Sequence, residues 1–315
     1  MYEPSIQDLR RAQERIGPSI HLTPVMTCST IDAICGAKIH FKCENLQKVG
    51  AFKIRGASNA VLCLDDEQAS RGVATHSSGN HGQALALAAQ RRGIAAHIVM
   101  PTNTSRAKKD AVAGYGARLI ECEPSLEDRE RTLDRIVAET GATLVHPYND
   151  PRVICGQGTA ALELLEQVDD LEIVVAPIGG GGLISGTCIA VTGNSPQPIV
   201  IGAEPKQADD AWQSIQAGRI IPVENPDTIA DGLRTSLGDL TFPIIAKHVR
   251  EIITVSEESI AAAMRLIWER MNLIVEPSAA VPLAAIQTRP NLFEGKRIGV
   301  ILTGGNADLN HLPWR

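Results

Sequence analysis

Short hydrophobic runs alternate along the chain with longer segments in which apolar residues recur every three or four positions. The segment 5–16 has this helical spacing and is predicted to form a helix. The run 39–43 alternates apolar and polar side chains, which is typical of a strand. An alanine-rich helix is expected to follow over 57–64.

The alternation becomes regular between residues 72 and 146. Short apolar runs predict strands at 72–75, 94–100, 118–122 and 143–146. The segments between them have helical spacing and predict helices at 83–91, 106–115 and 126–139. Strands that alternate with helices favour a small parallel sheet with helices on both faces.

A turn-rich stretch at 146–151 is expected to cross between two domains. Beyond it, the pattern predicts a helix at 158–168 and strands at 173–177, 199–204 and 298–302. We therefore predict an α/β fold with two open parallel-sheet domains that carry helices on both faces. The large domain is expected to comprise 1–71 and 150–315, and a small mobile domain, 72–149, is expected to close over the substrate.

Composition excludes several classes of function. The net charge of −6 disfavours a general nucleic-acid surface, and no apolar run approaches the ~20 residues that span a bilayer. The polar, acidic N-terminus does not match a signal peptide. The seven cysteines include no CxxC pair, so we expect reduced thiols in a cytoplasmic protein without a zinc site.

One lysine stands out as a candidate nucleophile. Lys53 lies between Phe52 and Ile54, with Gly50 and Gly56 on either side. Apolar neighbours partly desolvate an amine, which lowers its pKa and makes it a better nucleophile toward a carbonyl. We hypothesise that Lys53 holds pyridoxal phosphate as a Schiff base. The alternative is a solvated surface lysine.

Four consecutive glycines follow a hydrophobic strand and precede a helix: Gly179, Gly180, Gly181 and Gly182. A helix N-terminus presents unpaired N–H groups and a partial positive charge, and glycines let these groups surround a phosphate. The spacing matches neither a nucleoside-triphosphatase P-loop nor a dinucleotide fingerprint. A flexible turn is the alternative to a phosphate site.

Two further loops lie at strand ends. The segment 77–81, Ser-Ser-Gly-Asn-His, could hold a carboxylate with its hydroxyl and N–H groups, or Ser78 or Asn80 could simply cap a helix. Thr303 and the two glycines after it could meet the edge of a planar ring, or could form an ordinary turn. Glu204 and Asp210 follow another strand and could bind a divalent cation. The alternative is a solvated acidic loop that binds no metal.

Taken together, these motifs resemble the serine/threonine dehydratase and serine racemase family, and serine racemase most closely. This family belongs to the fold-type II pyridoxal phosphate enzymes, whose fold is similar to that of the tryptophan synthase β chain. The shared motifs are FKIRGA at 52–57, SSGNHGQ at 77–83, GQGT at 156–159, GGGG at 179–182, AEP at 203–205 and TGGN at 303–306.

The resemblance implies a role for each matching residue around the cofactor. Lys53 would bind pyridoxal phosphate and carry protons on one face of it, and Phe52 would pack beside its ring. Asn80 would hydrogen-bond the ring hydroxyl, and Thr303 would meet the pyridine nitrogen. A neutral hydroxyl at that nitrogen fits elimination more than transamination. The phosphate would be held by Gly179, Gly180, Gly181 and Gly182.

The resemblance also implies a substrate site and a metal site. Ser78 would be the base on the face opposite Lys53, and Thr235 would contact the substrate. Arg129 could pair with a β-carboxylate, although it could equally be a helix-surface arginine in a charged run. The substrate carboxylate would be bound by Ser77, Ser78, Asn80 and His81. The resemblance implies Mg²⁺, or Mn²⁺ or Ca²⁺, on Glu204, the Ala208 carbonyl and Asp210.

The resemblance implies a homodimeric lyase that converts a 3-hydroxy amino acid to a 2-oxo acid and ammonia. Serine, threonine and threo-3-hydroxyaspartate are the candidate substrates. A serine or aspartate racemase with dehydratase side activity is the runner-up. A β-replacement enzyme and a non-enzymatic amino-acid binding protein are weaker alternatives. Tyr148 replaces an asparagine of animal serine racemases, which puts nucleotide activation in doubt, and we expect no C-terminal regulatory domain.

Overall fold

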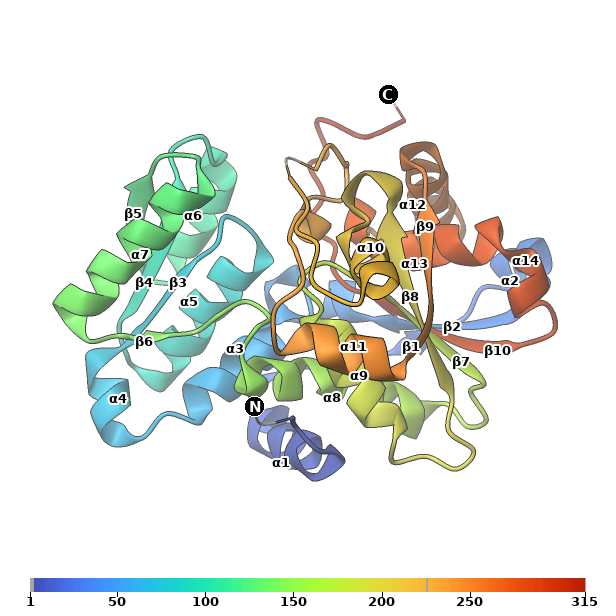
Figure 1. The fold of residues 1–315 in the computed structure, drawn as a ribbon, viewed down its shortest axis with the longest axis horizontal. Helices are drawn as coiled ribbons and strands as arrows, with labels where there is room; N and C mark the ends of the chain where they lie inside the picture. Colours follow the sequence, from blue (N-terminus) through green and yellow to red (C-terminus); the bar gives the residue numbers. More distant parts are fainter. Residues whose placement is uncertain (1–2, 225, 315) are drawn as a thin grey trace.

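The structure is a computed structural model that describes residues 3–224 and 226–314. Two separate sheets organise the described chain (Figure 1). The first has the order β1-β2-β10-β7-β8-β9, and only its edge strand β1 is antiparallel to its neighbour. Its strands are β1 (Val25–Met26), β2 (Lys38–Cys43), β7 (Ile173–Pro177), β8 (Ile199–Pro205), β9 (Val249–Val255) and β10 (Arg297–Leu302).

The second sheet is parallel and smaller. It has the order β5-β4-β3-β6, formed by β3 (Val73–His76), β4 (Ala96–Pro101), β5 (Arg118–Cys122) and β6 (Thr143–Leu144). Its helices are α5 (Asn80–Arg92), α6 (Arg106–Gly114) and α7 (Leu126–Thr140), on the left in Figure 1. Strands buried on both faces need apolar residues throughout, and β4 is buried along its whole length.

The remaining helices surround the larger sheet or join the two units. α1 begins after Ser5, whose side chain forms a capping box with Asp8. These helices are α1 (Ile6–Ile16), α2 (Ser29–Cys35), α3 (Lys53–Leu62), α4 (Asp66–Arg71), α8 (Pro151–Gln167), α9 (Gly182–Val191), α10 (Asp210–Ala217), α11 (Thr241–His248), α12 (Glu257–Met271), α13 (Pro277–Thr288) and α14 (Pro290–Phe293). Short 3₁₀ turns include η2 (Glu44–Leu46), η3 (Lys48–Gly50) and η5 (Asp231–Leu233).

The predicted fold class is confirmed, with corrections at element ends. The helix expected over 57–64 begins at Lys53, so the candidate lysine opens a helix instead of preceding one. α8 begins at Pro151 instead of 158, because Asp150 accepts a hydrogen bond from the Arg152 N–H and proline suits a first helical turn. β6 ends at Leu144, short of the predicted 146.

The two sheets fall within the residue ranges predicted for two domains. We propose that the domains divide at residues 72 and 149, as predicted. We also propose that the smaller domain is mobile. In the described ranges, no helix is long and apolar enough to cross a membrane. All seven cysteines lie in those ranges as free thiols, and only Cys63 is exposed.

Candidate active site

Lys53 is fixed where two distant segments meet. The backbone before it pairs with the segment after β10: the Phe52 N–H donates to the Thr303 carbonyl at 3.0 Å, and Ala51 forms an antiparallel bridge with Gly304. The Lys53 Nζ donates to the Pro147 carbonyl at 3.2 Å and lies 5.1 Å from the centre of the Phe52 ring. The FKIRGA and TGGN motifs are therefore parts of one site.

The environment of Lys53 makes its amine a nucleophile near neutral pH. Burial lowers its pKa from 10.5 to about 8, and the carboxylate of Glu276 offsets only part of this shift. The reduced pKa expected from the apolar neighbours is therefore present.

If Lys53 binds pyridoxal phosphate, as hypothesised from the sequence, the lowered pKa predicts the pH dependence of cofactor uptake by the apoprotein. Only the neutral amine attacks the cofactor's aldehyde, so the uptake rate should rise with pH below about 8 and level off above it. Stopped-flow growth of the visible absorbance band, measured from pH 6.5 to about 10 with a free lysine pKa of ~10.4 as reference, checks this. A rate that keeps climbing to the upper end of that range would contradict the assigned pKa.

The glycine loop lies between β7 and α9, as predicted, but the glycines are required by neighbouring protein groups. A methyl group on Gly180 would lie 2.3 Å from the Tyr148 ring, and one on Gly182 would lie 2.9 Å from Tyr148 Cβ. Gly181 has φ +87°, a conformation that side chains rarely adopt. The packing of Tyr148 on the loop, in addition to any phosphate, explains why glycine is needed here.

The N-terminus of α9 remains suited to an anion. The first helical N–H groups of any α-helix have no partner within the helix, and here the Ser185 N–H is the first to reach back, to the Gly181 carbonyl at 2.9 Å. The N–H groups before it therefore face the glycine loop with the positive end of the helix dipole. Thr235 also borders this loop, because its Oγ1 would lie 3.1 Å from a methyl group on Gly179.

The second anion loop follows β3. α5 begins at Asn80 with Gly79 as its N-cap, and in the described chain no side chain caps this helix. The capping alternative for Ser78 and Asn80 is therefore wrong. The Ser77 Oγ accepts from the Gly79 N–H at 3.3 Å, and the Ser78 hydroxyl has no partner among the described residues. This loop therefore combines hydroxyl groups with a helix N-terminus, and both favour an anion.

Asn80 is bonded to Glu276, the residue before α13, and to Asn306 in the segment after β10. Its Nδ2 donates to the two carboxylate oxygens of Glu276 at 3.1 and 3.0 Å, and its Oδ1 accepts from the Asn306 Nδ2 at 2.8 Å. Burial raises the pKa of Glu276 to about 7, and Asp231 adds to this shift. The Thr303 Oγ1 is buried without a hydrogen-bond partner in the described part of the protein.

Two histidines near the lysine are neutral. His81 donates from Nε2 to the Val145 carbonyl at 3.1 Å, and burial lowers its pKa to about 3. His146 accepts from the Tyr148 and Asn149 N–H groups on Nδ1, and burial lowers its pKa to about 4, with His76 and Lys53 adding to the shift. A neutral His81 carries no positive charge, so N–H and hydroxyl groups are the donors that this loop could offer to a carboxylate.

The candidate metal residues are buried next to one another. Glu204 accepts from the Ala211 and Trp212 N–H groups at 3.1 and 2.9 Å, so it also caps α10. Asp210 accepts from the Leu237 N–H through Oδ2, while its buried Oδ1 has no partner in the ranges 3–224 and 226–314. The solvated-loop alternative is therefore wrong. Across those ranges, no group of three or more His, Cys, Asp or Glu side chains could hold a metal.

Arg129 is half-buried on α7, and so is not simply a surface arginine. Its Nη2 donates to the Pro124 carbonyl at 2.9 Å, while its buried Nε has no partner among the residues described. Its positive charge also lowers the pKa of His76, which burial lowers most and Glu130 partly restores. Since His76 directly precedes Ser77, Arg129 lies within electrostatic reach of the loop 77–81.

Sequence reasoning missed the part that Pro147, Tyr148 and Glu276 play here. Pro147 and Tyr148 join the lysine to the glycine loop, and Glu276 joins Asn80 to Gly304 through its own N–H, which donates to the Gly304 carbonyl at 2.9 Å. The turn-rich stretch 146–151 was the available signal, because ligand sites occur preferentially where two domains meet.

These groups fit pyridoxal phosphate. A desolvated lysine, a helix N-terminus and the Thr303 hydroxyl, which has no partner among the residues that the structure describes, would supply partners for an aldehyde, a phosphate and a ring nitrogen. The sequence profile of the family described as "Pyridoxal-phosphate dependent enzyme" matches residues 16–304. The chain belongs to the pyridoxal-phosphate dependent enzyme family.

Several members of this family are similar over their whole length. The beta-hydroxyaspartate dehydratase of Paracoccus denitrificans (strain Pd 1222) is 55% identical over 314 residues, covering 100% of both chains. The serine racemase of Arabidopsis thaliana is 49% identical and covers 99% of this chain and 96% of its own. The structure of maize serine racemase aligns with a TM-score of 0.95 and 49% identity, covering 98% of this chain and 95% of the maize chain.

These similarities confirm the family predicted from the motifs. The protein is a pyridoxal phosphate-dependent enzyme, and its relatives are named as dehydratases and racemases. The fold agrees with this family, because the maize enzyme superimposes on nearly the whole chain.

Proposed function

We propose that this enzyme dehydrates a 3-hydroxy amino acid, with 3-hydroxyaspartate as the preferred substrate. The observation that carries the proposal is the 55% identity, over the full length of both chains, with a beta-hydroxyaspartate dehydratase. Serine and threonine are the other members of the substrate class. The products are a 2-oxo acid and ammonia.

Arg129 supports a substrate with a second carboxylate. Its Nε is buried and unpaired in the described chain, and a guanidinium can pair with a carboxylate through two parallel hydrogen bonds. An unpaired buried donor is costly, so a ligand that satisfies it gains affinity. Neither serine nor threonine carries a side-chain carboxylate that could do so.

The residues of the site divide the chemistry among them. When bound, pyridoxal phosphate supplies a conjugated electron acceptor for the pair left on the substrate's α-carbon. Lys53, with a pKa near 8, can accept the α-proton on its own side. The loop 77–81 and the N-terminus of α5 bind the α-carboxylate, and Thr303 stays a neutral partner for the ring nitrogen. Loss of the proton and the β-hydroxyl yields an enamine, which water hydrolyses to the oxo acid and ammonia.

A racemase is the second candidate. The identity of 49% with a serine racemase favours it, as does the Ser78 hydroxyl, which in the described residues has no partner and is therefore available to exchange a proton. If Ser78 donates to the face opposite Lys53, the same site yields the enantiomer. The two activities differ in whether the β-hydroxyl leaves before the α-carbon is protonated again.

A substrate panel tests the proposal. Purified enzyme with pyridoxal phosphate and Mg²⁺ is given L-serine, D-serine, L-threonine and each stereoisomer of 3-hydroxyaspartate, and is assayed for 2-oxo acid and by chiral chromatography. We expect the highest kcat/KM for oxo-acid release from a 3-hydroxyaspartate isomer. Enantiomer formed faster than oxo acid would assign the protein to the racemases instead.

Removing the Arg129 guanidinium should change substrate preference. Arg129→Ala is expected to lower kcat/KM for 3-hydroxyaspartate about 10- to 100-fold, because a hydrogen bond to a charged group contributes about 1.5–3 kcal/mol, while serine dehydration changes little. Arg131→Ala is the matched control, since this exposed arginine of the same helix pairs with Asp128. An unchanged ratio of the two kcat/KM values would remove Arg129 from the substrate site.

We also propose that Glu204, the Ala208 carbonyl and Asp210 bind Mg²⁺ or a similar cation. Saturating Mg²⁺ should then raise the Tm, because a ligand at 100 times its Kd stabilises the folded state by about 2.7 kcal/mol. Asp210→Asn should abolish this shift, whereas Asp209→Asn, which changes a carboxylate bonded to Gln213, should keep it. Equal shifts in both variants would disprove the site.

Homodimer formation and a cytoplasmic location stay predictions. An exposed apolar pair supports the dimer: Leu46 and Ile274 are 45% and 49% exposed, and the Asn45 amide holds their segments together by donating to the Ile274 carbonyl. We propose this surface as the dimer contact. Sedimentation of the wild type and of Ile274→Glu measures the oligomeric state.

A further inference from the structure

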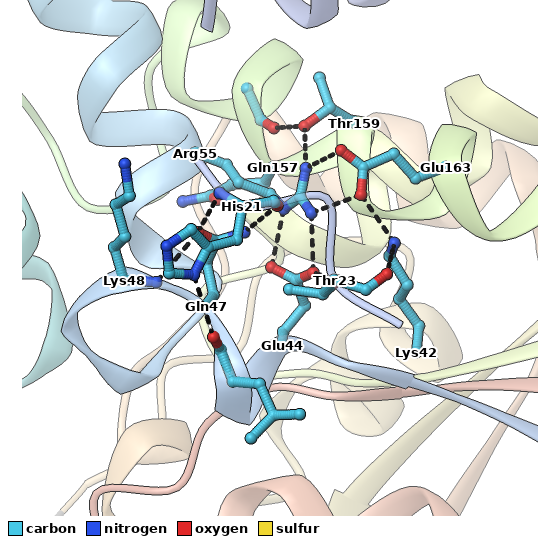
Figure 2. Close-up of polar contacts among 12 residues, drawn as sticks. His21, Thr23, Lys42, Glu44, Gln47, Lys48, Arg55, Gln157, Thr159 and Glu163 are labelled. Atoms are coloured by element: carbon cyan, nitrogen blue, oxygen red, sulfur yellow. Dashed lines mark hydrogen bonds and ion pairs between the residues drawn. The ribbon is translucent and has the colours of Figure 1, made fainter. Parts of the chain in front are cut away.

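A buried network of four charges includes Arg55, two positions after the candidate lysine in the same helix (Figure 2). Arg55 is fully buried and donates to both oxygens of Glu44, at 2.7 and 2.8 Å, and to both oxygens of Glu163, each at 2.7 Å. Lys42, also fully buried, donates to Glu163 at 2.6 Å. Two cations and two carboxylates balance one another, and Thr23 and Thr159 complete the hydrogen bonds.

The network joins three elements of the larger sheet unit to the first turn of α3. Lys42 lies in β2, Glu44 begins η2 and Glu163 lies in α8, whereas Arg55 lies in α3. Burial alone would raise the pKa of Glu44, but the Arg55 guanidinium holds it below its usual value, so this carboxylate stays charged. Arg55 bridges the two carboxylates. Its planar guanidinium donates two hydrogen bonds to each of them.

α3 lies between the two sheet units, and its two sides differ (Figure 1). Its apolar side, with Ile54, Ala57 and Val61, belongs to the same hydrophobic core as α5 and β4 of the smaller unit. Its polar side carries Arg55, and Asn59 donates to the Arg152 carbonyl of α8 at 2.7 Å. A methyl group on Gly156 would lie 2.5 Å from the Arg55 carbonyl oxygen, so α3 and α8 are in backbone contact.

Lys53 and Arg55 are two positions apart, about 200° around the helix. The lysine therefore faces Pro147 while the arginine faces Glu44 and Glu163. If the smaller unit moves, its apolar core pulls on α3, whereas the guanidinium anchors the same turn to the larger unit that carries Thr303 and the glycine loop.

We propose that Arg55 is a positioning residue that holds the first turn of α3, and with it Lys53, in register with Thr303 and the glycine loop. The inference rests on the proposed role of Lys53 as the cofactor lysine. A substitution that disrupts the network should therefore change the orientation of Lys53 and of the group bound to it, and lower the reaction rate in this way. A misplacement of about 1 Å can cost on the order of 100-fold in rate.

The test compares Arg55→Lys with Lys42→Met in the holoenzyme. Both residues are fully buried and both bond Glu163, but only Arg55 lies in the helix of the lysine. Arg55→Lys keeps the positive charge and loses the paired bonds, so it isolates geometry from charge. The readouts are Tm, pyridoxal phosphate content, the induced circular dichroism per bound cofactor, and kcat and KM for the best substrate.

We expect both variants to lower the Tm and to bind the cofactor fully. Arg55→Lys should also reduce the induced circular dichroism per cofactor and lower kcat by about 10- to 100-fold with little change in KM. Lys42→Met should retain the dichroism signal and kcat. Arg55→Lys with native dichroism and kcat would overturn the proposal, and so would equal losses in Lys42→Met, because then only the stability of the network matters.

A second variant serves if Arg55→Lys does not fold. Arg55→Met combined with Glu44→Gln removes one positive and one negative charge and leaves the Lys42–Glu163 pair intact. Replacing a buried ion pair by neutral groups is often nearly neutral for stability. We expect this variant to fold with altered dichroism and reduced kcat, and native values of both would again overturn the proposal.

The dichroism, cofactor content and Tm measurements need no substrate, so they give the same answer whichever amino acid the enzyme uses. Failure of the substrate panel therefore cannot be mistaken for failure of the positioning role. A wrong assignment of Lys53 is recognised separately, because Lys53→Ala would then retain the visible absorbance of the bound cofactor.

Discussion

Lys53→Ala is expected to lose the visible absorbance band of bound pyridoxal phosphate and to lower kcat/KM by roughly 10⁴-fold, the upper end of the range for a proton-transfer residue. The reason is that one substitution removes both the proposed covalent partner of the cofactor and the proposed base on the same face. The amine lies 3.2 Å from the Pro147 carbonyl, and its pKa of about 8 leaves a useful fraction neutral near pH 7.

Lys48→Ala is the control for this experiment. Lys48 lies close by in η3, but its Nζ donates to the Ser19 carbonyl at 2.9 Å and not to any group of the site. It should keep both the band and the activity. If Lys53→Ala kept the band while Lys48→Ala lost it, the cofactor would be attached elsewhere than the motif indicates.

Ser78→Ala should separate the two activities of the site. Racemisation is expected to fall by about 10²- to 10⁴-fold, because it needs a base on one face of the α-carbon and an acid on the other, and Ser78 is the proposed group on one of these faces. Dehydration of the isomers that give their α-proton to Lys53 should change far less. Chiral chromatography of the remaining substrate, together with oxo-acid release, measures both rates in one reaction.

The surviving dehydration is the internal control for folding and cofactor binding in this variant. Equal losses of racemisation and dehydration would show that Ser78 supports the carboxylate loop and not proton transfer on one face. Unchanged racemisation would assign the second base to another group, and the neutral His81 in the first turn of α5 would be the next residue to substitute.

Much of the fold follows from local sequence patterns. The strands at 118–122 and 173–177 have the predicted bounds, because short apolar runs between turn residues leave little choice. The glycine loop and Lys53 could be found because glycine and lysine are unusual in those surroundings. The start of α3 at Lys53 was missed because the pairing of the preceding residues with the segment after β10 determines it.

The remaining contacts of the site are long-range, and no local pattern predicts them. Asn80 and Glu276 are 196 positions apart, and Lys53 and Pro147 are 94 apart. Glu276 reads in the sequence as an ordinary residue before a helix beginning with proline, and Tyr148 as part of a turn. Glu276 and Tyr148 come to one place only through the arrangement of the two sheets, so their roles can be recognised only in the three-dimensional structure.

The order of strands in the larger sheet has a consequence for how the enzyme is made. β10, formed by Arg297–Leu302, lies in the middle of that sheet between β2 and β7, and the Thr303 carbonyl pairs with the backbone before Lys53. During synthesis, β2 and β7 emerge before β10 and cannot be joined into one sheet until residues near 300 leave the ribosome, because β10 is the strand that pairs with both. The nascent chain therefore has to keep two apolar strand edges from aggregating, and it can assemble a cofactor site only after nearly all of the described chain has been translated.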